Sequence, residues 1–384
     1  MRRAKSIIYV NYSPYENSGK ILDFLLENFE QIFLFSLGFY GLGNKKKYNR
    51  LLIFINGKLI EKKPLGQIPI PQGLFFLLLP LRSLIILIQI LVYSLWLKRK
   101  YGRIDYYFTV NAFTAWIGTI LKKIGLVNKT IFWVWDYYPP YHDNKIIVLM
   151  RQIYWYFDKV SSHSDYVAYV NQKLIDLRKD TGVLSRNASF QIVPIGTEKF
   201  NIKPRVKKDV VFGFIGVLKR SHGLDIIFDN EKLIGKYLPN ARLEVIGSGP
   251  DEMHFRQRAK KSPILTKFYG FLEDKKINEV LKKCSIGIAA YVPDKSNVSY
   301  YGDPGKVKRY LSLGLPVIVT KVVGFSKEID NSKAGVAIEY DNSENLIDAI
   351  KKIMSDYPTY QKNALSLSRK YYYKVIYKKM FALK

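Results

Sequence analysis

Short apolar runs alternate with helical patterns along the first half of the chain, and this alternation constrains the fold more than any other feature. Helical patterns such as ILDFLLENF, Ala112–Ile124 and Lys145–Val160 fall between most of the apolar runs. The runs that we expect to be strands are SIIYVNY, QIFLFSL, LLIFIN, DYYFTVN, TIFWVWD, DYVAYVN and FQIVPIG. Strands that are almost entirely apolar and separated by helices predict a parallel sheet covered on both faces.

The alternation stops at residues 197–209 and then starts again. The sequence there, TEKFNIKPRVKKD, is polar and aperiodic, as expected of a linker between domains. Beyond it come the apolar runs VVFGFIG, ARLEVIG, KFYGF, SIGIAAY, PVIVT and GVAIEY. A chain of 384 residues is also longer than one hydrophobic core usually supports. We therefore expect an α/β protein of two doubly wound, Rossmann-like domains, with ligands at the carboxyl ends of the strands in a cleft between the domains.

These patterns also give the expected domain boundaries. The first domain is expected over 1–196, the linker over 197–209 and the second domain over 210–356. The remaining residues, 357–384, have the pattern of a helical tail rich in Lys and Tyr. A return of this tail to the first domain is one arrangement that the pattern allows.

The chain has a formal net charge of +29, and both halves carry an excess of basic residues. Such a charge is compatible with nucleic acid, with an anionic membrane surface, or with a general Lys-rich composition. None of the motifs of nucleic-acid-binding modules occurs, so nucleic acid is not expected as a partner. Cys284 is the only cysteine, which excludes an internal disulfide and favours a small buried side chain.

Residues 74–97 are the most apolar part of the chain. Pro80 and Arg82 interrupt this stretch, which leaves Ser83–Leu97 as its uncharged part. That segment is short for a helix that spans a bilayer, and the basic residues 98–100 follow at once, as suits contact with anionic headgroups. Three interpretations stay open: a helix in the membrane surface, a helix buried in the protein and a spanning helix.

The first strand of the second domain ends in a glycine turn with concentrated positive charge. Gly216 closes the apolar run, and Lys219, Arg220 and His222 follow before the next helix. Cations at a strand end beside a helix amino terminus are suited to a diphosphate, although a solvated basic turn gives the same pattern. A less specific glycine turn follows the first strand of the chain. There Gly19 either lets the backbone approach a phosphate or simply forms a turn.

The most specific pattern in the sequence is YYGDPGKVKRYLSLGLPVIVT, Tyr300–Thr320. It combines a Gly-Asp-Pro-Gly turn, a basic amphipathic helix, a Gly-x-Pro stop and a buried strand. The segment resembles the donor-binding signature of retaining glycosyltransferases with the GT-B fold, family four (glycosyl transferases group one). There a Pro-x-Lys-x-x-Glu-Tyr-Leu-x-x-Gly-x-Pro-Val run binds the nucleotide-sugar. The matching positions are Pro304, Lys306, Tyr310, Leu311, Gly314, Pro316 and Val317.

Two positions depart from that signature. Arg309 stands where the family has the glutamate that hydrogen-bonds the nucleotide ribose, and an arginine has no acceptor to offer a hydroxyl pair. Tyr301 stands where the family has its other carboxylate. Asp303 is a candidate replacement for the missing carboxylate.

The likeness extends less specifically over most of the chain. GFIGVLKRSHG resembles the family's Gly-Arg-Leu…Lys-Gly loop, with His222 in place of its lysine. In the first domain, TIFWVWDYYPPYHD places Asp136 at the carboxyl end of a strand. The resemblance implies an ionisable residue near this place, against the transferred sugar. Asp136 is therefore the candidate catalytic residue, which orients the acceptor or stabilises the anomeric centre; an aspartate that caps a turn is the alternative.

The resemblance implies a glycosyltransferase that moves a hexosyl group, with retention, from a UDP- or GDP-sugar to a saccharide or a lipid-linked saccharide. Two alternatives remain, a sugar-nucleotide epimerase of the same architecture and a non-catalytic GT-B-like protein that binds nucleotide or glycan. The expected donor-binding residues are Gly19, Gly216, Lys219, Arg220, Asp303, Lys306 and Arg309.

No cofactor and no metal ion are expected. Asp-x-Asp and His-Glu-x-x-His motifs are absent from the sequence, and its four histidines are widely dispersed. Cationic side chains and helix amino termini would stabilise the departing diphosphate instead. The partners expected are the nucleotide-sugar, the acceptor and an anionic membrane surface, for a cytoplasmic protein that is peripheral on the inner face of the cell membrane.

Overall fold

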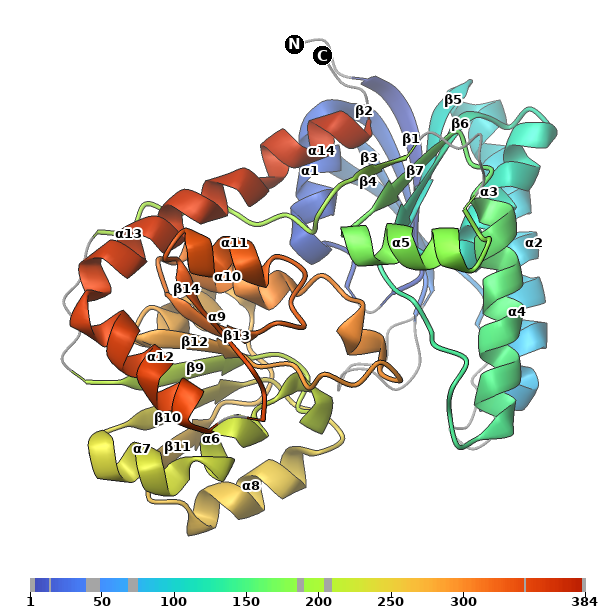
Figure 1. Cartoon of the computed structure of the whole chain (residues 1–384). Helices are drawn as coiled ribbons and strands as arrows, with labels where there is room; N and C mark the ends of the chain where they lie inside the picture. The colour runs from blue at the N-terminus through green and yellow to red at the C-terminus, as the bar shows by residue number, and fades with distance from the viewer. Residues whose placement is uncertain are drawn as a thin grey trace. The chain divides into compact units, whose positions relative to one another are not determined.

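The computed structural model of the chain describes residues 4–13, 15–38, 49–67, 75–184, 190–203, 209–341 and 343–381. The chain divides into two compact units, Met1–Pro194 with Ile376–Lys384 and Ile195–Val375 (Figure 1). The boundary between the two units lies after Pro194, two residues before the end of the first domain that was expected at 196. The expected tail is divided as well, because only its end from Ile376 belongs with the first unit. Residues 204–208 of the expected linker lie outside the described residues.

Within the described residues of the first unit, eight strands form one sheet in the order β4-β3-β2-β1-β5-β6-β7-β8. The strands are β1 (Ala4–Asn11), β2 (Phe29–Ser36), β3 (Arg50–Ile55), β4 (Lys58–Pro64), β5 (Ile104–Thr109), β6 (Val127–Val134), β7 (Tyr166–Tyr169) and β8 (Phe190–Ile192). The pairs β2–β3 and β3–β4 are antiparallel and the others are parallel. The expectation of an entirely parallel sheet was therefore wrong at this edge. Of the two antiparallel pairs, β3–β4 is joined by the turn Asn56-Gly57, whose two positive φ angles of 49° and 77° make a tight hairpin.

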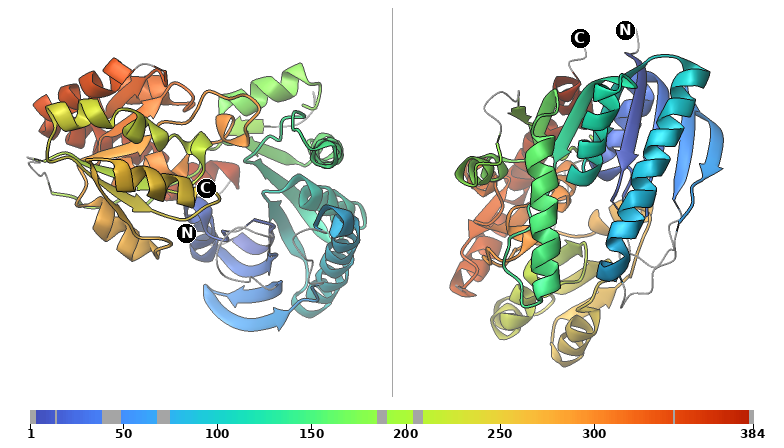
Figure 2. Two further views of the ribbon diagram at one scale, coloured as in Figure 1. Left: turned by 90° about the horizontal axis from the view of Figure 1, so that it is seen from below. Right: turned by 90° about the vertical axis from the view of Figure 1, so that its right-hand side faces the viewer.

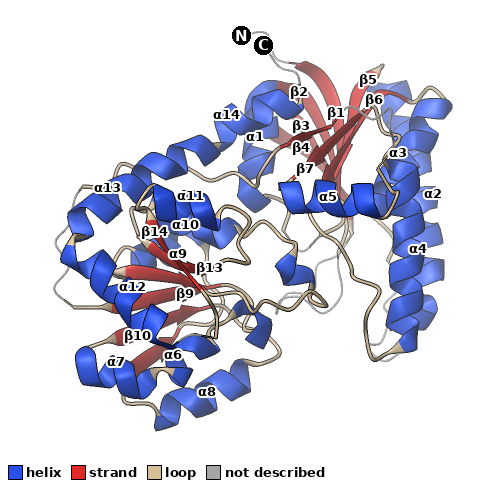
Figure 3. Cartoon of the chain, viewed as in Figure 1, coloured by secondary structure: helices blue, strands red, loops and turns tan. Residues whose placement is uncertain are grey.

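Helices cover both faces of this first sheet (Figure 3). They are α1 (Ile21–Asn28), α2 (Phe75–Tyr101), α3 (Ala112–Lys123), α4 (Lys145–Ser161), α5 (Gln172–Asp180) and α14 (Tyr373–Met380). Helices α2, α3 and α4 lie on one side, and α1 and α14 on the other. The rings of Phe24 on α1 and Tyr377 on α14 are 5.6 Å apart, which fixes the end of the chain to the first unit.

Helix α2 contains the most apolar stretch of the sequence. Pro80 and Arg82, which interrupt the apolar stretch in the sequence, do not interrupt the helix, which runs unbroken from Phe75 to Tyr101. Pro80 lies on the exposed side, where it removes one backbone hydrogen bond without ending the helix. Arg82 is buried and donates a hydrogen bond to the carbonyl of Gly38. By length and composition Leu77–Tyr101 could cross a membrane, a test that the core helix of a soluble protein also passes.

Within the described residues of the second unit, six parallel strands form a sheet in the order β11-β10-β9-β12-β13-β14. The strands are β9 (Val211–Ile215), β10 (Arg242–Ile246), β11 (Leu265–Phe268), β12 (Ile286–Ala289), β13 (Val317–Thr320) and β14 (Gly335–Ile338). The helices are α6 (Asp225–Asp229), α7 (Glu231–Tyr237), α8 (Glu252–Lys261), α9 (Asp274–Leu281), α10 (Gly305–Ser312), α11 (Ser326–Asn331), α12 (Ser343–Ser355) and α13 (Tyr357–Ser368). This strand order is that of a Rossmann domain, as predicted.

Two buried clusters make up the core of the second unit. One gathers the apolar side chains of β9, β10 and β12 with those of α6 and α12, and the other packs α10, α13 and Cys284 against β13. The buried position of Cys284 confirms the expectation for this residue.

Candidate functional site

The strand order of the second unit reverses between β9 and β12, and ligands of doubly wound sheets bind at the carboxyl ends of strands at such a reversal. Gly216 follows β9 with a φ of 141°, and Gly247 follows β10 with a φ of 126°. A Cβ on Gly247 would lie 1.9 Å from the carbonyl oxygen of Gly216, and one on Gly223 would lie 1.5 Å from that of Ala290. Glycine is therefore required for these turns to pack together.

Lys306 lies in the first turn of α10 and points at this reversal. Its Nζ is buried and has no hydrogen-bond partner among the described residues. The same atom lies 4.2 Å from the ring centre of Phe214 and 4.6 Å from that of Tyr291. A Cβ built on Gly216 would be 3.9 Å from it. Burial lowers the pKa of Lys306 to about 7. A buried amine without a partner, at a helix amino terminus and beside a glycine turn, is suited to a phosphate oxygen.

His222 does not supply a second cation to this place. Its Nδ1 lies 2.9 Å from the carbonyl oxygen of Val217, and its Nε2 lies 3.1 Å from the hydroxyl of Ser299. Burial, together with the charge of Lys306, lowers the pKa of His222 to about 3. The neutral ring therefore ties the Gly216 turn to the 3-10 helix Val298–Tyr300.

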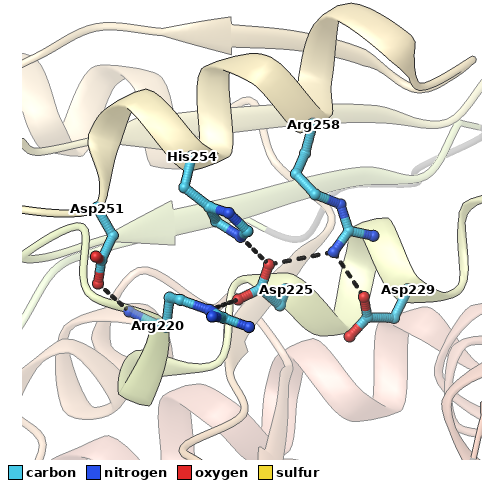
Figure 4. Close-up of polar contacts among 6 residues, drawn as sticks. All are labelled: Arg220, Asp225, Asp229, Asp251, His254 and Arg258. Carbon is cyan, nitrogen blue, oxygen red and sulfur yellow. Dashed lines mark hydrogen bonds and ion pairs between the residues drawn. The ribbon is translucent and has the colours of Figure 1, made fainter.

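The two other cations of the Gly216 turn lie at its outer side. Lys219 and Arg220 are both exposed. Arg220 is held in a polar network: its amide donates to Asp251 Oδ2 at 2.8 Å, and its Nε lies 3.4 Å from Asp225 Oδ2 (Figure 4). A contact of Lys219 or Arg220 with a diphosphate stays a prediction. Of the three cations considered for this purpose, only Lys306 is both buried and without a protein partner in the described chain.

The sequence did not point to this network, whose centre is the buried carboxylate of Asp225. His254 Nε2 lies 2.7 Å from Asp225 Oδ1, and Arg258 Nη1 lies 3.4 Å from the same oxygen (Figure 4). Arg258 also pairs with Asp229 at 2.7 Å. In the sequence, the indication of this network was the spacing of His254 and Arg258, which lie one helical turn apart on α8. The network fixes α8 to the helix that follows the Gly216 turn.

Asp303 and Arg309 are engaged elsewhere in the second unit. The carboxylate of Asp303 pairs with the fully buried Lys308 and accepts a hydrogen bond of 2.7 Å from the amide of Ile195. Arg309 donates to Asp274 at 2.8 Å and to Asn278 at 2.9 Å, both on α9. Neither side chain has an interaction that favours the ribose role, which stays a prediction for both.

In the first unit, Asp136 follows β6 and Gly19 follows β1. Burial raises the pKa of Asp136 to about 6, against the opposite effect of Arg178. Gly19 has a φ of 62°, and its carbonyl accepts a 2.7 Å hydrogen bond from the Tyr377 hydroxyl. Catalysis by Asp136 and phosphate contact by Gly19 stay predictions, and so does a transfer site between the two units.

The described part of the chain contains no group of three or more His, Cys, Asp or Glu side chains that could hold a metal ion. Independence of metal stays a prediction that requires an experiment.

Comparison with known families identifies the second unit. Residues 209–356 match the family model of the glycosyl transferases group 1. This segment is a glycosyl transferases group 1 domain. The resemblance drawn from Tyr300–Thr320 is thereby confirmed, and with it the prediction of a glycosyltransferase at the level of the family.

Solved structures of low sequence identity share the fold of this chain, over nearly all of it or over a large part. Sucrose-phosphate synthase from Thermosynechococcus elongatus matches with a TM-score of 0.70 and 15% identity, over 99% of this chain and 100% of that one. The Anabaena protein HepE in complex with UDP and glucose matches with a TM-score of 0.68 and 14% identity, over 98% of each chain. The pneumococcal O-GlcNAc transferase GtfA in complex with UDP and GlcNAc matches with a TM-score of 0.54 and 14% identity, over 72% of this chain and 56% of that one. A comparison with curated protein sequences found no match. These neighbours confirm the two-domain GT-B fold.

Proposed function

We propose that this glycosyltransferase transfers a hexosyl group from a UDP-sugar, with retention, to a saccharide or lipid-linked saccharide. The observation that carries the proposal is Lys306, a buried amine without a protein partner in the described chain, at the strand reversal of a group 1 domain. UDP is favoured over GDP because neighbours of the same fold, HepE and GtfA, were solved with UDP.

In this proposal the donor diphosphate lies between the amino terminus of α10 and the turn at Gly216. Protonated Lys306 and the amino terminus of α10 stabilise the negative charge that grows on the diphosphate as the bond from the sugar C1 to the phosphate oxygen breaks. The rings of Phe214 and Tyr291 lie 4.2 Å and 4.6 Å from the Lys306 nitrogen and shield it from water. Removal of water by these two rings strengthens the charge interaction.

The sugar and the acceptor would then meet residues of the first unit. Asp136 is proposed to be ionised above pH 6, as its raised pKa implies, and to stabilise the positive charge that develops at the anomeric carbon. We further propose that the protein works peripherally at the inner face of the cell membrane, where a lipid-linked acceptor would be presented.

A thermal-shift screen against UDP, GDP, CMP and their sugar conjugates tests the donor class. A ligand present at about 100 times its Kd stabilises the folded state by about 2.7 kcal/mol, which is a clear rise in melting temperature. Stabilisation by UDP and a UDP-hexose alone is the expected result, and stabilisation by GDP alone would assign the other donor. A protein that binds UDP-hexose but releases no UDP with any acceptor would be the non-catalytic alternative. NMR of the product gives the anomeric configuration, and inversion would overturn the proposed retention.

A further inference from the structure

Two neighbouring helices of the first unit each leave an apolar stripe uncovered. On α2 the stripe consists of six aliphatic side chains with the spacing of a helix face: Leu77, Leu81, Leu84, Ile88, Val92 and Leu95. On α4 it consists of Ile146, Leu149, Ile153 and Tyr156. Each of these ten side chains is at least 40% exposed. A soluble protein rarely leaves so many large apolar side chains together in water without a partner for them.

The two stripes belong to one side of the molecule. Helices α2 and α4 contact each other and lie side by side, as both Figure 1 and the right-hand view in Figure 2 show. They also run in the same direction, because each ends where a strand of the parallel part of the sheet begins, β5 after α2 and β7 after α4. We call these ten side chains the α2–α4 face.

The exposed charged side chains on helices α2 and α4 themselves are all basic. Helix α2 contains no acidic residue, and the one acidic residue of α4, Asp158, is buried in an ion pair with Arg178. Basic residues 98–100 close α2, and Lys159 lies at the end of α4. Since both helices end at the same edge of the sheet, these cations form a band at one end of the α2–α4 face.

Aromatic side chains lie beside this basic band. Trp96 on α2 is half-buried, with the Nζ of Lys63 4.3 Å and that of Lys100 4.9 Å from its ring. Tyr93 lies 6.3 Å from Trp96 between ring centres. Rings with one apolar and one polar side are favoured at the boundary between headgroups and acyl chains.

Helix α2 is not free to cross a bilayer while the first unit is folded. Its opposite side, with Ile86, Ile90 and Leu97, is buried in the core of that unit. The buried Arg82 donates to a backbone carbonyl there. Only the outer stripe is available, which suits a helix that lies in the membrane surface.

We propose that the α2–α4 face docks the protein on an anionic lipid bilayer, with the ten apolar side chains at the acyl boundary and the basic band on the headgroups. A second copy of the chain fits less well, because it would add a second basic band and would not supply the negative charge that the first one lacks on these helices. The proposal extends the expectation for residues 74–97 in one respect, since α4 contributes four of the ten side chains beside the six of α2.

Co-flotation of the full chain with vesicles of phosphatidylcholine, alone or with about 30 mol% phosphatidylglycerol, tests the proposal. The apolar variants change Leu84 and Ile88 to Gln on α2, or Leu149 and Ile153 to Gln on α4. A matched control changes four exposed apolar residues of the second unit to Gln, namely Tyr237, Met253, Leu265 and Phe271. Circular dichroism and thermal melting establish that each variant is folded.

We expect binding to the anionic vesicles, with a partition coefficient reduced at least about tenfold by either apolar variant and unchanged in the control. Replacing residues 98–100 with Gln should reduce it about 25-fold, since a surface cation contributes about fivefold and Glu61 already neutralises Lys100. Raising the salt concentration to about 0.5 M should have a similar effect.

Three outcomes would overturn the proposal. The first is binding that the α4 variant does not change, and the second is binding that resists salt and alkaline carbonate, as a spanning helix would. The third is absence of flotation together with a dimer in light scattering that the apolar variants dissociate. Because the readout is lipid binding, a failure here leaves the donor site untouched, and a failure of UDP binding leaves this surface standing.

Discussion

The side-chain nitrogen of Lys306 lies 4.2 Å from the centre of the Phe214 ring, beside the glycine turn that ends β9. The aromatic enclosure removes the amine from water and lowers its pKa to about 7. In the free protein near neutral pH, Lys306 is thus divided between its charged and neutral forms. A diphosphate would select the charged form.

The affinity for a UDP-sugar should therefore depend on pH in a defined direction. Below pH 7 Lys306 is already protonated and affinity is at its maximum, whereas above pH 7 each bound donor must also draw a proton from solvent. The Kd for UDP-glucose should rise about tenfold per pH unit between pH 7 and pH 9. Calorimetry in buffers of different ionisation enthalpy measures the proton uptake, and Lys306→Gln should abolish it. A wild-type Kd that is constant over this range would argue against a lysine with this pKa in the site.

The pair of Asp303 and Lys308 should be a determinant of stability. Asp303→Ala leaves the charge of Lys308 buried without its partner, which should cost about 3–5 kcal/mol in the free energy of unfolding. Asp303→Ala combined with Lys308→Met should recover most of this loss. Urea unfolding measures both values. A folded double variant that no longer binds UDP would show that Asp303 also contacts the nucleotide.

Activity should fall in acid through the ionisation of Asp136. The pKa of this carboxyl is raised to about 6, so the ionised form is complete above that pH and is lost as the pH decreases through it. We expect kcat to decrease about tenfold per pH unit below pH 6, and Asp136→Asn to lower kcat about 10²–10⁴-fold. The acid limb should be absent in the variant. If Asp136→Asn kept the wild-type kcat and pH profile, Asp136 would have no catalytic role.

Turnover should not require a divalent ion. In the proposed mechanism, Lys306 and the amino terminus of α10 stabilise the negative charge of the leaving diphosphate, as a metal ion does in other transferases. UDP release measured with EDTA and with added Mg²⁺ or Mn²⁺ should agree within experimental error. Loss of activity in EDTA that Mn²⁺ restores would contradict this assignment.

The fold was predictable because nearly every strand is a short apolar run between helices. The strand β4 was missed since its sequence, KLIEKKP, is mostly charged, which is typical of an edge strand and carries little hydrophobic signal. The sequence alone left open the length of the helix in residues 74–97. Helix α2 continues through Pro80 because a proline on the exposed side of a long apolar helix costs less than the burial of the opposite side contributes.

The candidate site was only partly predictable. Lys306 could be chosen from the sequence because it occupies the lysine position of the donor-binding signature that the segment resembles, between Pro304 and Gly314. The neutral state of His222 and the pairing of Asp303 with Lys308 depend on burial by segments far apart in the chain. The same holds for Arg309, whose partners on α9 precede it by about one strand and one loop.

Calorimetric titration of UDP into the wild type and into Lys306→Ala tests the central claim most directly. Loss of a charge-assisted contact predicts that the variant binds UDP more weakly by about 1.5–3 kcal/mol, with Lys261→Ala, an exposed cation at the end of α8, as the control. Because the Lys306 nitrogen makes no hydrogen bond within the described chain, the variant should keep the wild-type melting temperature or exceed it. Equal affinity for UDP in wild type and Lys306→Ala would contradict the account, since it would remove Lys306 from the donor site.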